Sequence, residues 1–380
     1  MNWELDAEHR EFQATCRTFV DRHVRPVVDE AELLGRPPGR LWKELGAAGL
    51  LGLLTPEEYG GSGGDQLAVA LLAEELARAS GGIAVSPLVS AYMAAPHIVA
   101  YGSIEQRARH LPALARGDSV AAIAVTEPGS GSDVAGITSS AVADGAGYRL
   151  NGRKMFITNA GLASVLIVAA KTAPEADRRG ISTFVVEAGT PGLSFGRPLA
   201  KMGWHACDTR EVILDDVVVP ATGLLGELNR GFYQIMDAFQ LERVALAAMG
   251  VGHAAECLHL ATEHARVREA FGAPLTGLQS VRHRLAAMAV ELESARLMIY
   301  RAAQRLGSGH PTAARSVAMA KYHAALAAGN IVDAAVQILG GSGLIEESPV
   351  TRHYRDVRVL RIGGGADEIQ LEILSRELTP

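Results

Sequence analysis

The chain has 380 residues and a net charge of −6, with 48% apolar and 21% charged residues. This length exceeds the usual ceiling for one hydrophobic core, so we expect two or three packed domains, and the composition argues against disorder. No uninterrupted apolar run approaches the roughly 20 residues that span a bilayer, which predicts a soluble chain with no membrane partner. The acidic balance and the lack of a Lys/Arg tract exclude nucleic acid as a partner.

The N-terminus and the cysteines bear on location. Residues 5–19 already follow a helical period, so we expect no signal or transit peptide. The three cysteines, Cys16, Cys207 and Cys257, lie far apart and form no CxxC pair, which indicates neither a disulfide framework nor a metal site. A reducing, cytoplasmic location fits this cysteine usage.

The spacing of apolar residues changes once within the first 230 residues. Residues 1–118 are predicted as helices joined by Gly/Pro-rich segments such as 36–39 and 60–64. From about residue 119 the period becomes two, as in a small antiparallel barrel or sandwich. The candidate strands cover residues 120–125, 139–143, 148–150, 165–170, 183–187 and 211–219.

After about residue 231 long helical patterns return. Residues 281–306 and 317–338 each carry apolar side chains at alternating spacings of four and three, the seam of a four-helix bundle. The predicted fold is therefore α+β with three domains: an N-terminal helical domain (1–118), a central β domain (119–230) and a C-terminal four-helix bundle (231–380). This order excludes a doubly wound dehydrogenase.

Glu242 is an acid on an apolar helix stripe. One helix is predicted over residues 233–265, and one of its faces carries Ile235, Phe239, Glu242, Leu246, Met249 and His253. A carboxylate on that face points toward protein, and burial without a partner raises its pKa toward the value that a general base needs. The alternative is that Glu242 pairs with a basic residue across the bundle.

The same helix contains a misleading motif. Residues 250–255 match the GxGxxA pattern of dinucleotide-binding proteins. That pattern binds a nucleotide only where a strand turns tightly into a helix, and here it lies inside a helix. We therefore expect no nicotinamide site.

Two segments of the β region carry polar groups suited to a ligand, residues 124–133 and 151–159. In the first, small residues let backbone N–H groups approach a ligand, and Thr126, Ser130 and Ser132 add hydroxyls, so the loop could cradle a pyrophosphate. A simple polar turn is the alternative.

With these segments identified, the chain resembles the acyl-CoA dehydrogenase family over essentially its whole length. Residues 126–133 (TEPGSGSD) and 154–159 (KMFITN) look like its two flavin-binding signatures. Residues 56–64 match its N-terminal domain and 201–203 its β domain. Residues 268–272, Gln279 and 337–343 match its C-terminal bundle.

The resemblance implies FAD bound between subunits of a homotetramer, a dimer of dimers. Phe156 would pack on the isoalloxazine ring, and Thr158 would hydrogen-bond flavin N5. The implied cofactor-binding residues are Val125, Thr126, Gly131, Ser132, Phe156, Ile157 and Thr158 at the flavin and pyrophosphate, Arg268, Phe271, Gln279, Gln337, Gly340 and Gly341 at the ADP half, largely from the neighbouring subunit, and Ala366 and Glu368. Ser132, Arg243 and Gly363 would contact the substrate.

The chain also departs from the commonest family pattern. Those members carry their catalytic Glu just before the last helix, where this chain has Gly364. Isovaleryl-CoA and long-chain acyl-CoA dehydrogenases place it on the bundle helix before an Arg, and Glu242-Arg243 occupies that position. Ala366 stands where a hydroxyl is usual, which removes an expected N-cap that Asp367 could replace at the same terminus.

The implied reaction is α,β-dehydrogenation of an acyl thioester, either an acyl-CoA or an acyl-carrier protein. Glu242 would take the α proton and flavin N5 the hydride, while the Gly364 N–H and a flavin ribityl hydroxyl stabilise the thioester oxygen. Electron-transfer flavoprotein is the expected acceptor. Gly363 replaces a common Tyr and favours a short or branched acyl group. The alternatives are an oxidase that uses O2, a flavin-dependent monooxygenase and a non-catalytic flavoprotein.

Overall fold

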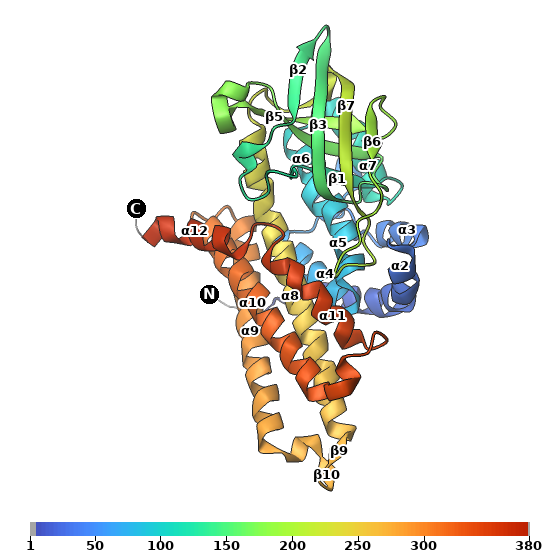
Figure 1. Ribbon diagram of the computed structural model, residues 1–380, viewed down its shortest axis with the longest axis vertical. Coiled ribbons are helices and arrows are strands. Elements are labelled where there is room, and N and C mark those ends of the chain that lie inside the picture. Colours follow the sequence, from blue (N-terminus) through green and yellow to red (C-terminus); the bar gives the residue numbers. More distant parts are fainter. Residues whose placement is uncertain (1–4, 379–380) are drawn as a thin grey trace.

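The computed structural model describes residues 5–378, so both outer predicted domains extend beyond the described part of the chain, by residues 1–4 and 379–380. A β-sheet region lies at one end of the molecule and a long helical bundle reaches the other, with the N-terminal helices beside them (Figure 1). The N-terminal helices are α1 Ala7–Phe19, α2 Val28–Leu34, α3 Gly39–Ala47, α4 Gln66–Ala79, α5 Gly81–Leu88, α6 Ala95–Tyr101 and α7 Ile104–Ala115. The three-part architecture predicted from the sequence is confirmed.

The central sheet is mixed. Its strands are β1 Ala121–Ala124, β2 Ser140–Asp144, β3 Gly147–Thr158, β4 Val165–Lys171, β5 Ile181–Glu187, β6 Leu193–Phe195, β7 Thr209–Pro220 and β8 Leu224–Leu225. They follow the order β6-β7-β3-β2-β4-β5-β8, with β1 added beside β4. Most pairings are antiparallel, as expected, but β1–β4 and β2–β4 are parallel, which an alternating pattern alone does not reveal. The six candidate strands are present, whereas β6 and β8 gave no signal.

The C-terminal region is built on three long helices. Its elements are α8 Gly231–Val267, the short hairpin β9 Glu269–Ala270 and β10 Ala273–Pro274, α9 Gln279–Gly307, α10 Ala313–Leu339, α11 Pro349–Val357, η10 Arg358–Arg361 and α12 Asp367–Leu378. The GxGxxA match lies within α8, as predicted. A Cβ on Gly252 would come within 2.2 Å of the Glu74 carbonyl oxygen on α4, so this glycine permits close helix packing.

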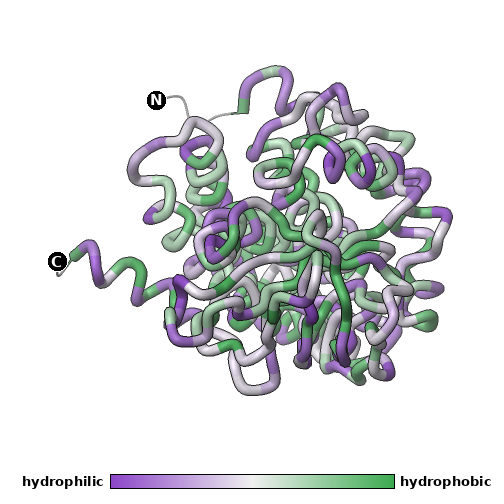
Figure 2. The backbone as a smooth tube through the Cα atoms, turned by 90° about the horizontal axis from the view of Figure 1, so that it is seen from above, coloured by the Kyte–Doolittle hydropathy of each residue, from purple (hydrophilic) through white to green (hydrophobic). Residues whose placement is uncertain are grey.

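One hydrophobic core joins the N-terminal helices to the bundle. It contains residues from α1 and α4 together with residues from α8, α9 and α10, so the outer two predicted domains share a core. A separate core lies within the β region. Seen along the long axis, polar segments lie mainly at the periphery and α12 projects from the body (Figure 2).

Three helical stretches are long and apolar enough to cross a membrane by length and composition alone: Gly81–Tyr101, Gly231–Val267 and Ala313–Gly343. The sequence-based expectation concerned uninterrupted apolar runs, and these stretches contain polar residues. In the fold, 83%, 78% and 44% of their most apolar windows are buried. The first two therefore use most of that surface for packing.

Candidate functional site

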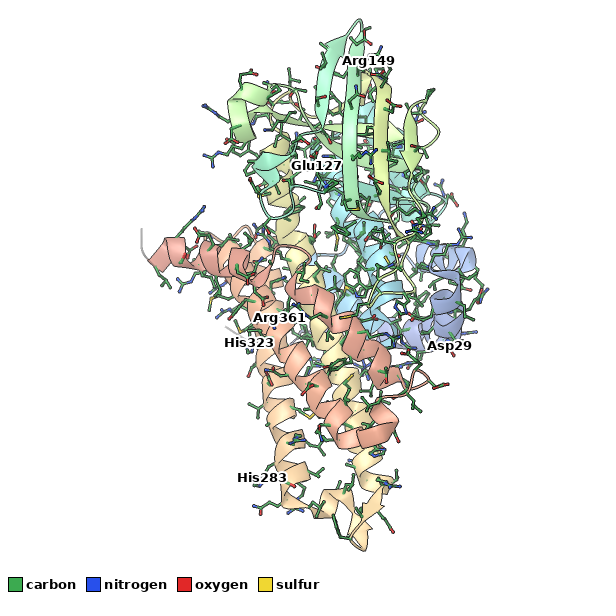
Figure 3. All side chains as sticks on the ribbon, in the orientation of Figure 1. Asp29, Glu127, Arg149, His283, His323 and Arg361 are labelled. Carbon is green, nitrogen blue, oxygen red and sulfur yellow. The ribbon has the colours of Figure 1, made fainter. Side chains whose placement is uncertain are left out.

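The two segments singled out in the β region are joined directly. The Met155 N–H donates to the Thr126 carbonyl at 2.8 Å, and Lys154 Nζ lies 2.7 Å from Glu127 Oε1. The side chains of Lys154 and Glu127 are 0% and 4% exposed. Figure 3 shows Glu127 where the loop after β1 passes beside β3. This buried ion pair fixes the loop against the strand.

Glu127 has every partner that an ionised carboxylate needs. The Thr138 N–H and hydroxyl donate to Oε2 at 2.6 and 2.8 Å, and the Ser139 N–H donates to Oε1 at 2.9 Å. Burial pushes the pKa of Glu127 up, but the charge and hydrogen bond of Lys154 and the other donors hold it at about 2. Glu127 is therefore a permanently charged structural group at neutral pH.

An open surface lies over these two segments. Phe156 is 67% exposed and has a φ of 62°, at an irregularity in the pairing of β3 with β7. A bulky residue in this backbone region is strained, which is typical of functional sites. Ser132 is exposed, and a Cβ on Gly131 would meet nothing within 4 Å. An exposed aromatic ring beside a small-residue loop fits a flat ring system that carries a pyrophosphate.

The other residues predicted here contribute in different ways. Thr126 and Thr158 are partly buried, whereas Val125 and Ile157 are 7% and 3% exposed and belong to apolar clusters. Val125 and Ile157 can therefore reach a ligand only through their backbone.

The start of α8 packs against the same loop. Ile235 and Phe239 lie in one apolar cluster with Val125 and Val134, which flank the loop at either end. Glu242 follows Phe239 by three residues on the same helix. The fold therefore ties the predicted base to the loop that is predicted to hold the cofactor.

Glu242 differs from Glu127 in having no hydrogen-bond or ion-pair partner in the part of the chain that the structure describes. Its side chain is partly buried, and within residues 5–378 its carboxylate makes no hydrogen bond and no ion pair. Burial raises the pKa of Glu242 to about 7, although the charges of Arg243 and Lys321 oppose the rise. The alternative pairing across the bundle is therefore not found in the described chain, and the group is poised to exchange a proton near neutral pH.

A glycine loop between η10 and α12 faces Glu242. Gly364 has a φ of 66°, and a Cβ there would lie 3.5 Å from Glu242 Oε1 and 2.5 Å from Leu246 Cδ1. Its carbonyl accepts a hydrogen bond from Arg243 Nε at 3.2 Å, while its N–H has no acceptor among the described residues. Beside it, a Cβ on Gly363 would meet only Val359, at 3.6 Å or more. The loop thus brings Gly364, whose N–H has no acceptor among the described residues, close to the carboxylate, and it leaves the side-chain position of Gly363 open.

Arg243 and the start of α12 support that loop. Arg243 is 5% exposed and directed at the Gly364 carbonyl, so it lies behind the loop. Asp367 does not cap α12 with a hydrogen bond within the described chain. Its carboxylate pairs instead with Arg361 Nε at 2.6 Å. Ala366 is partly buried and Glu368 is exposed.

The residues predicted for the ADP half form a separate group. Arg268 directly follows α8, Gln279 begins α9, and Phe271 is 96% exposed in the β9–β10 hairpin between them. Figure 1 shows this hairpin at the end of the bundle opposite the sheet. At the end of α10, Gln337 is exposed, and a Cβ on Gly340 or Gly341 would meet nothing within 4 Å. The chain by itself does not bring this hairpin to Phe156.

Two features of the site were missed in the sequence. The Glu127–Lys154 pair joins residues 27 positions apart and had no local signal. Lys321 did have a local sequence signal. It lies four residues after Val317 and three before Ala324, so it is a charged residue at the spacing of the predicted apolar seam. No group of three or more His, Cys, Asp or Glu side chains within residues 5–378 could hold a metal ion.

Comparison with known proteins identifies the family. The acyl-CoA dehydrogenase N-terminal, middle and C-terminal domain models match residues 6–118, 122–217 and 229–379. The chain belongs to the acyl-CoA dehydrogenase family. It is therefore a flavin-dependent oxidoreductase that acts on CH–CH groups of acyl donors, and FAD is its cofactor.

Individual relatives cover nearly the whole chain. A 3-(aryl)acrylate reductase of Clostridium sporogenes is 37% identical over 377 residues, 98% of each chain. The butyryl-CoA dehydrogenase structure from Megasphaera elsdenii superposes with a TM-score of 0.96 at 35% identity, covering 100% of both chains. The FAD complex of PigA superposes with a TM-score of 0.95 at 31% identity, covering 100% of this chain and 99% of PigA.

Proposed function

We propose that this protein oxidises a short or branched acyl thioester to the 2-enoyl thioester, with Glu242 as the base that removes the α proton. The proposal rests on the partly buried Glu242 carboxylate, which has no hydrogen-bond or ion-pair partner among the described residues, and on the nearby Gly364 N–H, which has no acceptor among them. A base needs a raised pKa and a nearby donor that stabilises the developing enolate oxygen, and these two residues supply both.

The chain's own residues perform three tasks in this reaction. Glu242 accepts the α proton, and the Gly364 N–H donates a hydrogen bond to the thioester oxygen, which acidifies that proton. Phe156 and the loop around Gly131 form an open platform that fits the flavin ring and its pyrophosphate. FAD, when bound there, supplies the two-electron acceptor for the hydride from the β carbon. Leu246, which is 4% exposed and lies one helical turn after Glu242, would help to keep water from the carboxylate.

The size of the acyl group follows from Gly363. Its side-chain position is open, so the space that a larger residue would occupy is left for substrate. We propose that this space accepts a branch near the α and β carbons. Because one methylene in such a pocket is worth only ~1–3 kcal/mol, the preference should be graded. A steady rise of kcat/KM from four to sixteen straight-chain carbons would contradict it.

The acceptor and the assembly are part of the same proposal. Electron-transfer flavoprotein is the proposed acceptor, and a carrier protein in place of CoA is the alternative thioester. The exposure of Phe271, Arg268 and Gln279 at the end of the bundle away from Phe156 supports a site completed by a second subunit, as in a homotetramer. A colourless monomer that fails to take up FAD would contradict this part. We also propose a cytoplasmic location.

The test is anaerobic flavin reduction. The purified holoenzyme is mixed with acyl-CoA and acyl-carrier thioesters without oxygen, and the loss of flavin absorbance is followed for the unmodified protein and for Glu242→Gln. Gln preserves size but removes the base, so FAD should stay bound while reduction slows by about 10²–10⁴-fold or more. Equal rates would contradict the role of Glu242. Rapid oxygen consumption without another acceptor would favour an oxidase instead.

A further inference from the structure

Lys321 is a buried cation beneath the glycine loop. It lies on α10 and is 1% exposed, and its Nζ donates to the Gly365 carbonyl at 2.7 Å. Gln370 Nε2 donates to the same oxygen at 3.0 Å. With Arg243 on the Gly364 carbonyl, three side chains hold two successive carbonyls of the loop. These contacts restrain the backbone directly after the Gly364 N–H.

Holding a carbonyl does not require a charge, and a buried ammonium is expensive. A neutral side chain, Gln370, already makes the same hydrogen bond. The charge of Lys321 therefore calls for a separate explanation. Its ammonium interacts favourably with Asp367 on α12 and Glu242 on α8, and unfavourably with Arg243 on α8 and Arg361 on η10.

The two acids near Lys321 are not equivalent. Asp367 already has a close ion pair with Arg361, whereas Glu242 has no direct partner in the part of the chain that the structure describes. Among the described residues, the charges of Arg243 and Lys321 favour ionised Glu242, and Arg243 is its neighbour on the same helix. Lys321 is thus the one group from another element that favours the ionised form of Glu242 among the described residues.

We propose that Lys321 is a positioning residue for this reaction: it holds the Gly365 carbonyl so that the Gly364 N–H stays aimed at the substrate, and its charge favours the ionised Glu242 carboxylate. The inference rests on the proposed role of Glu242. Burial lowers the pKa of Lys321 to about 8, so its charge is present in the range where Glu242 titrates.

Three variants separate the hydrogen bond from the charge. Lys321→Met removes both, Lys321→Gln keeps a donor without charge, and Gln370→Leu removes a neutral donor to the same carbonyl. For each variant, the rate of anaerobic flavin reduction is measured from pH 5 to 9. The protonation of Glu242 is followed independently by its carboxylic acid infrared band, assigned by its absence in Glu242→Gln.

Loss of the Lys321 charge should raise the pKa of Glu242, so the acid limb of the rate profile and the infrared titration should both move up by about one pH unit in Lys321→Met and Lys321→Gln. Gln370→Leu should leave the acid limb and the infrared titration at their original pH. The rate at the plateau should fall about 10- to 100-fold in Lys321→Met, and less in Lys321→Gln, which keeps a donor.

The outcomes distinguish this inference from the proposed function. If Glu242→Gln loses activity but the Lys321 variants leave the acid limb and the infrared titration unmoved, the role of Lys321 is wrong and that of Glu242 stands. If Glu242→Gln reduces FAD at the original rate, the proposed base is wrong. If Lys321→Met fails to fold, Lys321→Gln and Gln370→Leu still test the role of the charge. An equal shift of the Glu242 titration in these two variants would contradict that role.

Discussion

Glu127 and Glu242 are both glutamates taken at least partly out of water near the predicted flavin site, yet their environments are opposite. Glu127 has Lys154 at 2.7 Å and donors from Thr138 and Ser139, and its pKa is held at about 2 despite burial. Glu242 has no direct partner within residues 5–378, and burial raises its pKa to about 7. Burial alone therefore does not make a base; the presence or absence of donors decides.

The difference also assigns the two residues to different tasks. Glu127 connects the loop of residues 126–133 to β3, so it acts on stability and on the shape of the proposed flavin-binding surface. Glu242 lies close to Gly364 of the glycine loop and is the proposed base. Three predictions test this division, in decreasing order of expected effect.

The largest effect is expected from moving the base. Glu242→Gly should slow flavin reduction by about 10²–10⁴-fold. Adding Gly364→Glu should raise the rate of flavin reduction at least tenfold above that of Glu242→Gly, because a Cβ at residue 364 lies 3.5 Å from the present Glu242 Oε1. Recovery should stay about 10²-fold below the original rate, since the backbone φ of 66° and Leu246 at 2.5 Å strain the new side chain.

The matched control is Glu242→Gly with Gly363→Glu. A Cβ there approaches Val359 and not Glu242, so this acid should not restore the rate. The contradicting result is a double variant that binds FAD but reduces it no faster than Glu242→Gly alone. It would show that positions 242 and 364 do not serve one α carbon.

The second prediction concerns substitution of Glu127. Glu127→Gln leaves Lys154 buried without its counter-charge, which should cost about 3–5 kcal/mol of unfolding free energy, measured by denaturant titration of the holoprotein. The double variant Glu127→Gln with Lys154→Met should lose less unfolding free energy than Glu127→Gln alone, because neither side chain of the pair then carries a buried charge. If Glu127→Gln instead kept full stability and slowed α-proton removal, Glu127 would belong to the chemistry.

These two glutamates show what sequence could predict. The stripe through Ile235, Glu242 and Leu246 is local, so the helical period alone identifies the acid on α8 and the face on which it lies. The partners of Glu127 come from β3 and from the segment before β2, and such long-range contacts leave no periodic trace. The absence of a partner for Glu242 is also a tertiary property. The family resemblance selects the residue, and the fold explains its chemistry.

The same limit applies to the sheet and to the loop behind the base. The alternating pattern predicted strands but not the parallel pairing of β1 with β4, and β6 and β8 were too short for a detectable period. Lys321 and Gly365 are 44 residues apart, so their contact could not be predicted although the position of Lys321 in the seam was visible.

The third and smallest effect is on stability against pH. The folded-state pKa of Glu242 is above its ordinary value of 4.5, so folding favours the protonated form and stability falls as pH rises from about 4.5 to 7. Glu242→Gln should therefore match the unmodified protein below pH 4.5 and exceed it by about 2 kcal/mol above pH 7, after allowance for partial exposure.

Glu127 should show the reverse dependence in the same measurements. Its folded-state pKa is lowered to about 2, so its contribution to stability is present above pH 4.5 and is lost as pH falls toward 2. Parallel pH dependences for Glu242→Gln and Glu127→Gln, relative to the unmodified protein, would contradict the contrast between the two sites.

The pH dependence of kcat/KM tests the central claim most directly, because it reports the essential base of the free enzyme. It should be measured with the acyl-CoA that bleaches the flavin fastest, from pH 5 to 9. The raised pKa of Glu242 predicts that kcat/KM rises about tenfold per pH unit and levels off near pH 7. A profile flat down to pH 5, as an ordinary or ion-paired carboxylate would give, would show that Glu242 is not held near neutrality.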